Sequence, residues 1–243
     1  MKKLAIAVPT YNEIENINEF VKAVYETAQK LKNTNTTLII IDDNSPDGTG
    51  KVVDKLMKIY KTDSFRIDPI HREKKLGLST AYIQAFKKAL AENFDYILTM
   101  DADFSHKVEY IPTFLSLIKK YDLVIGSRNI KKGGVEDWSI IRHIISKGGS
   151  LYSRMILGVN VKDFTAGFVM YRKKVLESLD LENIKSQGYS FAIEMKYKII
   201  KKGFTYIEFP IIFPDRKKGT AKINKKILLE ALLRVWQLRF SKK

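Results

Sequence analysis

The chain is 243 residues long, enough for one large hydrophobic core, and its 45% hydrophobic and 29% charged residues are typical of a globular protein. It contains no cysteine, which excludes disulfides, thiolate metal sites and cysteine nucleophiles. The net charge of +16 favours an anionic partner: nucleic acid, an anionic membrane surface or a phosphorylated substrate. Scattered surface lysines account for part of this excess, but basic residues also concentrate at 131–132, 216–226 and 239–243.

The hydrophobic pattern predicts strands and helices in alternation. Short apolar runs that break at polar or proline-containing segments indicate strands at 4–8, 38–41, 65–70, 96–100, 123–126, 168–171 and 204–213. Apolar residues at helical spacing indicate helices at 14–31, 49–60, from 77 onward, 110–120, 139–157, 190–202 and 227–240. This alternation predicts an α/β fold, a mostly parallel sheet flanked by helices with right-handed crossovers. We expect a single catalytic domain over residues 1–215, followed by a basic amphipathic segment over 216–243.

Two aspartates follow the strand predicted at 96–100. Asp101 and Asp103 are separated by one alanine and leave this strand at its carboxyl end, where ligands bind in open α/β sheets. Two carboxylates this close repel each other unless a cation lies between them. Mg²⁺ and Mn²⁺ prefer oxygen ligands, and phosphate oxygens can fill their remaining positions. The pattern predicts a divalent metal with a phosphorylated ligand, although a solvated turn is the alternative for an isolated pair of this kind.

Two other predicted strands deliver polar residues to the same edge of the sheet. These are Thr10, Tyr11, Asn12 and Glu13 after the first strand, and Asp42 and Asp43 after the second. A nucleotide bound there would find a tyrosine for its base, carboxylates for base N–H groups and ribose hydroxyls, and a metal for its diphosphate. Neither GxGxxG nor GxxxxGK[ST] occurs at the strand ends, so we expect neither a dinucleotide-binding fold nor a P-loop.

Several segments carry a resemblance to a known family. VPTYNEIENI, IDDNSPDGTG, MDADFSH and GSRN, in this order and spacing, resemble the family 2 glycosyltransferases of the GT-A fold. KGGVEDWSIIRHIISKGGSLYSR, DFTAGFVMYR and FPDRKKGTAK are similar to the dolichyl-phosphate (polyprenyl-phosphate) mannose synthases. The similarity runs from about Leu4 to Lys222, nearly the whole chain. It implies a GT-A-type, Rossmann-like sheet and transfer of a sugar from a nucleotide donor.

The resemblance also implies a reaction and the residues that carry it. Mannose would move from GDP-mannose to dolichyl or another polyprenyl phosphate with inversion, giving a β-mannosyl phosphate. The implied catalytic residues are Asp101, Asp103 and Arg128. Nucleotide-sugar binding would fall to Pro9, Tyr11, Asn12, Glu13, Asp42, Asp43, Asp101, Ala102, Asp103 and Arg128. Binding of the acceptor phosphate would fall to Arg128, Arg142, Arg216 and Lys222.

The implied cofactor is Mg²⁺ or Mn²⁺, held by Asp101, Asp103 and Ser105. Relatives often place a glutamine two residues after the second aspartate, where this chain has Ser105. A hydroxyl reaches less far and binds a metal more weakly than an amide oxygen, so metal affinity and preference are open. A phosphate monoester is already anionic near neutral pH, so the implied reaction needs no strong general base.

A polyprenyl chain is insoluble in water, so the implied acceptor predicts a protein bound at a membrane surface. The helices at 139–157 and 227–240 combine apolar faces with basic residues, as interfacial helices do, although packing on the sheet is the alternative for both. No apolar run reaches the length of a bilayer span, and the first residues pass directly into a strand pattern. We therefore expect a cytoplasmic protein without a signal peptide, peripheral on the cytosolic face of a membrane. Whether a small membrane-anchoring subunit takes part stays open.

Three alternatives remain. Another polyprenyl-phosphate glycosyltransferase would use UDP-glucose or a different sugar nucleotide, and the DDNSP segment favours the mannose type by resemblance only. A basic nucleic-acid-binding domain would explain the net charge, but no recognisable motif supports it, so we expect no nucleic acid partner. A non-catalytic subunit is disfavoured by the intact Asp101, Asp103 and Arg128.

Overall fold

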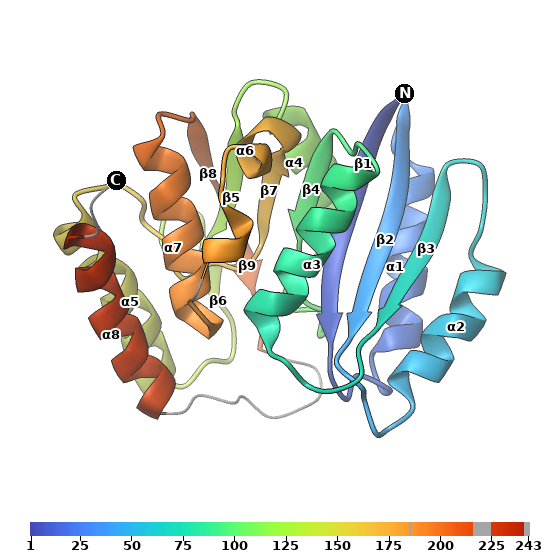
Figure 1. Ribbon diagram of the computed structural model, residues 1–243, viewed down its shortest axis with the longest axis horizontal. Helices are drawn as coiled ribbons and strands as arrows, with labels where there is room; N and C mark the ends of the chain where they lie inside the picture. Colours follow the sequence, from blue (N-terminus) through green and yellow to red (C-terminus); the bar gives the residue numbers. More distant parts are fainter. Residues whose placement is uncertain (185, 216–224, 241–243) are drawn as a thin grey trace.

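A seven-stranded sheet forms the centre of the protein (Figure 1). The computed structural model describes residues 1–184, 186–215 and 225–240. The strands lie in the order β3-β2-β1-β4-β7-β5-β8. Their bounds are β1 Lys2–Thr10, β2 Thr34–Asp42, β3 Phe65–His71, β4 Tyr96–Thr99, β5 Leu123–Ser127, β7 Val169–Arg172 and β8 Tyr206–Pro210. All neighbouring pairs are parallel except those of β7, which is antiparallel to both β4 and β5. The predicted mostly parallel α/β sheet is confirmed.

Helices cover both faces of this sheet, because alternate residues of each strand point to opposite sides. Ala5, Ala7 and Ile39 face a core shared with α3 and α7, whereas Leu4 and Ile6 face a core shared with α1, α2 and α4. Both sides are apolar, which is why the strands appear in the sequence as continuous hydrophobic runs. The helix bounds are α1 Ile17–Gln29, α2 Thr49–Ile59, α3 Leu78–Ala91, α4 Ile111–Leu117, α5 Ile140–Leu157, α6 Lys173–Glu177, α7 Gly188–Lys201 and α8 Lys225–Phe240, with 3₁₀ turns at Val108–Tyr110 and Leu181–Asn183.

The helices α5 and α8 contact each other beside α7, at the β8 end of the sheet (Figure 1). In the described part of α8, Val235 and Leu238 are buried in the core while Leu233 and Trp236 are exposed. Arg234 ties α8 to α7 by donating to the buried Glu194 at 3.0 Å. The C-terminal helix therefore both packs on the domain and presents an apolar outer face.

Two details differ from the sequence prediction. The strand expected at 204–213 divides, because β9 (Ile212–Phe213) leaves β8 and pairs with β6 (Gly134–Val135) in a second, two-stranded sheet. The helix expected at 110–120 is shorter, with a 3₁₀ turn followed by α4. In the described ranges, none of the helices combines the length and the apolar character that crossing a membrane requires.

Candidate active site

The two aspartates lie in a tightly held loop after β4. The backbone N–H of Asp101 donates to Nδ1 of His106 at 2.8 Å, so the hydrogen-bonded imidazole carries no proton on that nitrogen. His106 is buried and stacks on the ring of Phe168, with the ring centroids 4.9 Å apart. Oδ1 of Asp103 accepts from the backbone N–H of Ser105 at 3.1 Å and from its hydroxyl at 2.5 Å. Local hydrogen bonds thus hold the backbone of Asp101 and the carboxylate of Asp103 at the carboxyl end of the central strand, where the sequence predicted both residues.

These side chains suit a divalent cation in part. Asp101 is 38% exposed at its side chain, whereas Asp103 is buried. Among the described residues there is no cluster of three or more His, Cys, Asp or Glu side chains that could hold a metal by itself. Mg²⁺ is commonly held by one or two carboxylates together with substrate phosphates and water, so the donor set fits a cation that arrives with a diphosphate. The Ser105 hydroxyl donates to Asp103 here, and its predicted role as a ligand stays a prediction.

Tyr82 on α3 is a residue of this site that the sequence prediction missed. Its side chain is buried, and burial raises the pKa of its hydroxyl well above the ordinary value. The negative charge of Asp101 raises this pKa further, and Asp103 adds a smaller contribution. The hydroxyl therefore stays protonated beside the two aspartates. The only signal in the sequence was its position one residue after the inward-facing Ala81.

Asp42 holds the end of β1 against the loop that follows β2. Its Oδ1 accepts from the hydroxyls of Thr10 at 3.1 Å and Ser45 at 2.5 Å, and its Oδ2 accepts from the Ser45 N–H. The Ser45 hydroxyl in turn accepts from the backbone N–H of Asn12, whose φ of 60° bends the chain away from β1. Asp42 and Asn12 therefore lie together, as predicted, and Ser45 links them.

Asp43 accepts from a buried arginine that the sequence prediction did not consider. Arg72 Nη1 donates to Asp43 Oδ1 at 2.6 Å, and the Gly77 N–H donates to Oδ2 at 3.1 Å. The loop between β3 and α3 is thereby fixed beside the nucleotide edge. In the same loop, Lys75 places its ammonium 3.6 Å from the ring centroid of Tyr11, the residue predicted to pack on a base.

The remaining residues predicted to bind the donor lie around the same edge. Glu13 accepts from the Asn16 amide at 2.9 Å and begins the turn into α1. Pro9 pairs in register with Ile41 of β2, next to the end of β1. Ala102 is buried between the two aspartates. The structure thus brings the predicted donor residues from the ends of β1, β2 and β4 to one edge of the sheet.

Arg128, at the end of β5, is fixed by a fork-shaped ion pair. Its Nε and Nη2 donate to the two oxygens of Asp163 at 2.8 and 2.7 Å, and Nη2 also donates to Thr165 at 2.8 Å. Burial alone would lower the pKa of Arg128, but the charge of Asp163 raises it, with a smaller contribution from Asp101. Arg128 therefore remains cationic, within electrostatic reach of Asp101.

Arg142, in the first turn of α5, contacts the same aromatic ring as Arg128, the indole of Trp138. The guanidinium carbon of Arg142 is 3.9 Å from the ring centroid of Trp138, and that of Arg128 is 5.5 Å away. Arg142 Nη1 also donates to Asp215 Oδ1 at 2.6 Å. Two of the four residues predicted for the acceptor phosphate are thus brought together. The other two, Arg216 and Lys222, lie outside the described residues.

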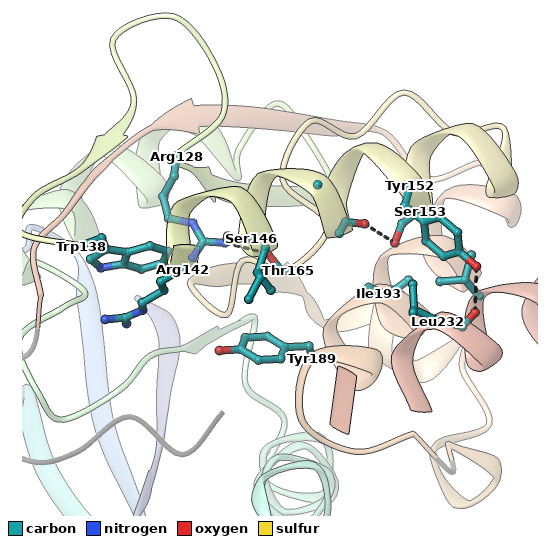
Figure 2. Close-up of a pocket in the computed structure, with 14 residues that line it drawn as sticks. Arg128, Trp138, Arg142, Ser146, Tyr152, Ser153, Thr165, Tyr189, Ile193 and Leu232 are labelled. Atoms are coloured by element: carbon teal, nitrogen blue, oxygen red, sulfur yellow. Dashed lines mark hydrogen bonds between the residues drawn. The ribbon is translucent and has the colours of Figure 1, made fainter. Parts of the chain in front are cut away.

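A cavity of about 280 Å³ extends from these arginines between α5, α7 and α8. Figure 2 shows Arg128, Trp138 and Arg142 at one end and Tyr152, Ser153 and Leu232 at the other. The lining also includes Gly148, Gly149 and Ile193. The two glycines leave space along α5, since a Cβ at either position would meet nothing within 4 Å. The cavity therefore offers a cationic mouth and a mainly apolar interior.

Comparison with known proteins identifies the family of this chain. The family described as "Glycosyl transferase family 2" matches residues 5–180, and the chain belongs to that family. It is 36% identical over 241 residues to polyprenol monophosphomannose synthase of Mycolicibacterium smegmatis, covering 98% of this chain and 88% of the relative. It is 37% identical over 235 residues to undecaprenyl-phosphate mannosyltransferase of Micrococcus luteus, covering 97% and 93%. The resemblance seen in the sequence motifs is confirmed.

Solved structures confirm the GT-A-like fold. Glucosyl-3-phosphoglycerate synthase from Mycobacterium tuberculosis, in complex with Mn²⁺, UDP-glucose and phosphoglyceric acid, aligns with a TM-score of 0.67 at 15% identity, over 98% of this chain and 79% of that one. A mannosyltransferase from Pyrobaculum calidifontis, in complex with GDP-mannose and Mn²⁺, aligns with a TM-score of 0.58 at 14% identity, over 98% and 72%. At these identities the likeness shows the fold alone.

Proposed function

We propose that this glycosyltransferase transfers mannose from GDP-mannose to the phosphate of a polyprenyl phosphate, such as dolichyl phosphate, with inversion at the anomeric carbon. The observation that carries the proposal is the cavity with Arg128 and Arg142 at its mouth and an apolar interior. A phosphate at the mouth would meet two guanidinium groups, and the first isoprene units would lie along Gly148 and Gly149. The names of the two close relatives support the same substrate class.

On the donor side, Asp101 and Asp103 would hold Mg²⁺ or Mn²⁺ against the diphosphate. When bound, such a metal would supply Lewis-acid stabilisation of the leaving diphosphate. Asp42, Asn12 and Tyr11 would line the nucleoside subsite, since the structure gathers them at one edge. Asp43 would contribute chiefly through Arg72 and Gly77, which it holds in place.

On the acceptor side, a phosphate oxygen would attack the anomeric carbon of mannose. The new bond joins that oxygen to the sugar, and the bond from the sugar to the diphosphate breaks, so that GDP leaves with the electron pair. The phosphate monoester already carries negative charge near pH 7, so no proton has to be removed first. Arg128 and Arg142 would offset the repulsion between acceptor and donor phosphates, which makes catalysis mainly positioning and electrostatics.

The acceptor's lipid chain requires contact with a membrane, and the outer face of α5 and α8 suits one. Ile141 and Met155 of α5 are 72% and 67% exposed, and Leu233 and Trp236 of α8 are 57% and 47% exposed. Arg154 and Arg239 lie on the same two helices and could meet anionic headgroups. We propose peripheral binding on the cytosolic face through these helices.

The test is transfer by the purified protein, with GDP-mannose or UDP-glucose as donor and a polyprenyl phosphate in detergent as acceptor. We expect a lipid-linked mannose product with GDP-mannose, lost on addition of EDTA and restored by Mn²⁺ or Mg²⁺. Transfer from UDP-glucose but not from GDP-mannose would support polyprenyl phosphate as the acceptor and reject GDP-mannose as the donor. Absence of a lipid product with either donor would reject the proposed acceptor.

A further inference from the structure

Lys196 on α7 is a fully buried lysine that the proposed mechanism does not yet use. Its side chain is 1% exposed, and its ammonium donates to the backbone carbonyls of Ala166 at 2.6 Å, Phe164 at 3.0 Å and Ala192 at 3.4 Å. Burial lowers the pKa of Lys196 to about 7, since low polarity disfavours the ammonium. Burying an ammonium costs free energy that an apolar side chain of similar length would not cost. The hydrogen bonds to the 163–166 loop point to a role there.

The same loop is held at its other end by Glu208 of β8. Glu208 Oε2 accepts from the backbone N–H of Lys162 at 2.8 Å, and Oε1 accepts from that of Asp163 at 2.9 Å. The Glu208 carboxylate therefore holds the start of the loop, and the Lys196 ammonium holds the carbonyls of Phe164 and Ala166 further along. Both Glu208 and Lys196 hold the loop through hydrogen bonds to its backbone.

The 163–166 loop in turn holds Arg128. Asp163 and Thr165 accept three hydrogen bonds from the side chain of Arg128, through Nε and Nη2. Within the described parts of the chain, Nη1 of Arg128 makes no hydrogen bond, while the residue lines the mouth of the cavity. The loop therefore fixes the plane of the guanidinium and leaves donors for a ligand in the cavity.

Lys196 also balances charge around this arginine. Asp163 is fully buried and cancels the charge of Arg128 when only the pair is considered. Burial alone would raise the pKa of the Asp163 carboxyl, but the charge of Arg128 and, more weakly, that of Lys196 lower it. When Lys196 is protonated, the Asp163 carboxylate has two cations beside it, Arg128 and Lys196. The net charge of the three groups is then positive, so Arg128 still attracts an anion.

We propose that Lys196 is a positioning residue for the acceptor phosphate: it fixes the 163–166 loop and offsets Asp163, so that Arg128 meets the phosphate in one orientation with its charge effective. This inference rests on the proposed function, because it takes the ligand at the cavity mouth to be the phosphate of a polyprenyl phosphate. It concerns the acceptor alone and predicts no effect on the nucleotide.

The experiment is calorimetric titration of Lys196→Met with geranyl phosphate, a two-isoprene acceptor, and separately with GDP and Mn²⁺. We expect geranyl phosphate to bind roughly tenfold more weakly, about the loss of one charge-assisted hydrogen bond, and GDP to bind within about twofold of wild type. Lys201→Met is the matched control, because it makes the same change at an exposed position of the same helix. It should change neither affinity.

A second readout is the pH dependence of geranyl phosphate binding. As the pH rises through about 7, Lys196 loses its charge, and wild-type affinity should fall, whereas Lys196→Met should show no such step. The charged groups that act on Lys196 are Asp163, Arg128 and Glu208. If Lys196→Met does not fold, Glu208→Gln replaces one of the two side-chain oxygens that accept from the backbone N–H groups of Lys162 and Asp163. It should weaken geranyl phosphate binding selectively.

The outcomes separate this inference from the proposed function. Unchanged binding of geranyl phosphate by a folded Lys196→Met, or an equal loss of GDP affinity, would overturn the positioning role. Failure of the wild type to bind geranyl phosphate at all would overturn it too. Selective loss of geranyl phosphate binding, in a protein that transfers no mannose, would support the positioning role while rejecting the transfer reaction.

Discussion

Arg72 and Asp43 form an ion pair in which Nη1 and Oδ1 are 2.6 Å apart and both side chains are less than a tenth exposed. Arg72 Nη2 also donates to Thr80 at 2.6 Å. The loop between β3 and α3 is thereby joined to the end of β2. The sequence pattern suggested the Asp43 carboxylate as a ligand for a ribose hydroxyl. In the structure this carboxylate accepts hydrogen bonds from Arg72 and Gly77 instead, so its role in binding is to hold the loop beside the nucleotide edge.

Removal of one partner of this pair should destabilise the protein. Arg72→Met would leave Asp43 buried without its cation, and we expect a loss of about 3–5 kcal/mol in the free energy of unfolding, measured by urea denaturation. Arg66→Met removes a pair with Glu92 whose side chains are 52% and 32% exposed, and it should cost less than about 1 kcal/mol. Equal losses in the two variants would contradict a special role for the Arg72 pair.

Asp103→Asn should remove most of the metal-dependent affinity for GDP. The neutral amide cannot offset a divalent cation, and we expect at least about a hundredfold weaker binding in the presence of Mn²⁺. Calorimetric titration measures this, with and without EDTA. Asp63→Asn, at an exposed position after α2, is the control and should bind as wild type does. Normal Mn²⁺-dependent binding by Asp103→Asn would remove this carboxylate from the metal site.

Arg142→Gln should weaken the binding of the acceptor and leave the binding of the donor nucleotide unchanged. The guanidinium lies against Trp138 at the cavity mouth, so its loss should raise the KM for polyprenyl phosphate by roughly tenfold without a matching change in GDP affinity. Steady-state kinetics at varied concentrations of polyprenyl phosphate measure this KM. Arg66→Gln, at a 52% exposed position of β3, is the control for a general loss of positive charge. A lower GDP affinity in Arg142→Gln would move this residue to the donor side.

The exposed apolar face of α5 should be needed for membrane binding. Ile141→Glu places a charge where a 72% exposed side chain would enter the interface, and liposome co-sedimentation should fall several-fold. Ile59→Glu is the matched control, since Ile59 is 69% exposed on α2, away from α5 and α8. If both variants bind liposomes equally well, the α5 face is not the membrane contact.

Stability should depend on pH through Lys196. The pKa of this residue is about 7 in the folded protein and has its ordinary value of 10.5 when the chain is unfolded. Between these two values the unfolded state holds the extra proton, so this residue's contribution to stability rises with pH across that window. Below about pH 7 both states are protonated, and the cost of the buried charge is fully present. Urea midpoints at pH 6 and 9 should therefore differ more in wild type than in Lys196→Met, and an identical difference would contradict the buried titration.

Much of the fold could be predicted because its signals are local. A strand buried on both faces must be apolar throughout, so runs such as 38–41 and 96–100 stood out, and the helices between them showed their spacing. The place of Asp101 and Asp103 followed from the same rule, since residues after a parallel strand lie at the ligand-binding edge. The order of the strands was not predictable in this way, and neither was the antiparallel β7 between β4 and β5.

The sequence alone determined the class of fold, the carboxylate edge and the family resemblance, because each depends on residues close together in the chain. Only the tertiary structure decided that Arg128 pairs with Asp163, that Arg72 occupies Asp43, and that α5, α7 and α8 enclose a cavity. Those relationships join residues or elements that are distant along the chain, and packing selects such partners. A charge pattern shows that an arginine is present, but the buried carboxylate that fixes its orientation is defined only when the chain folds.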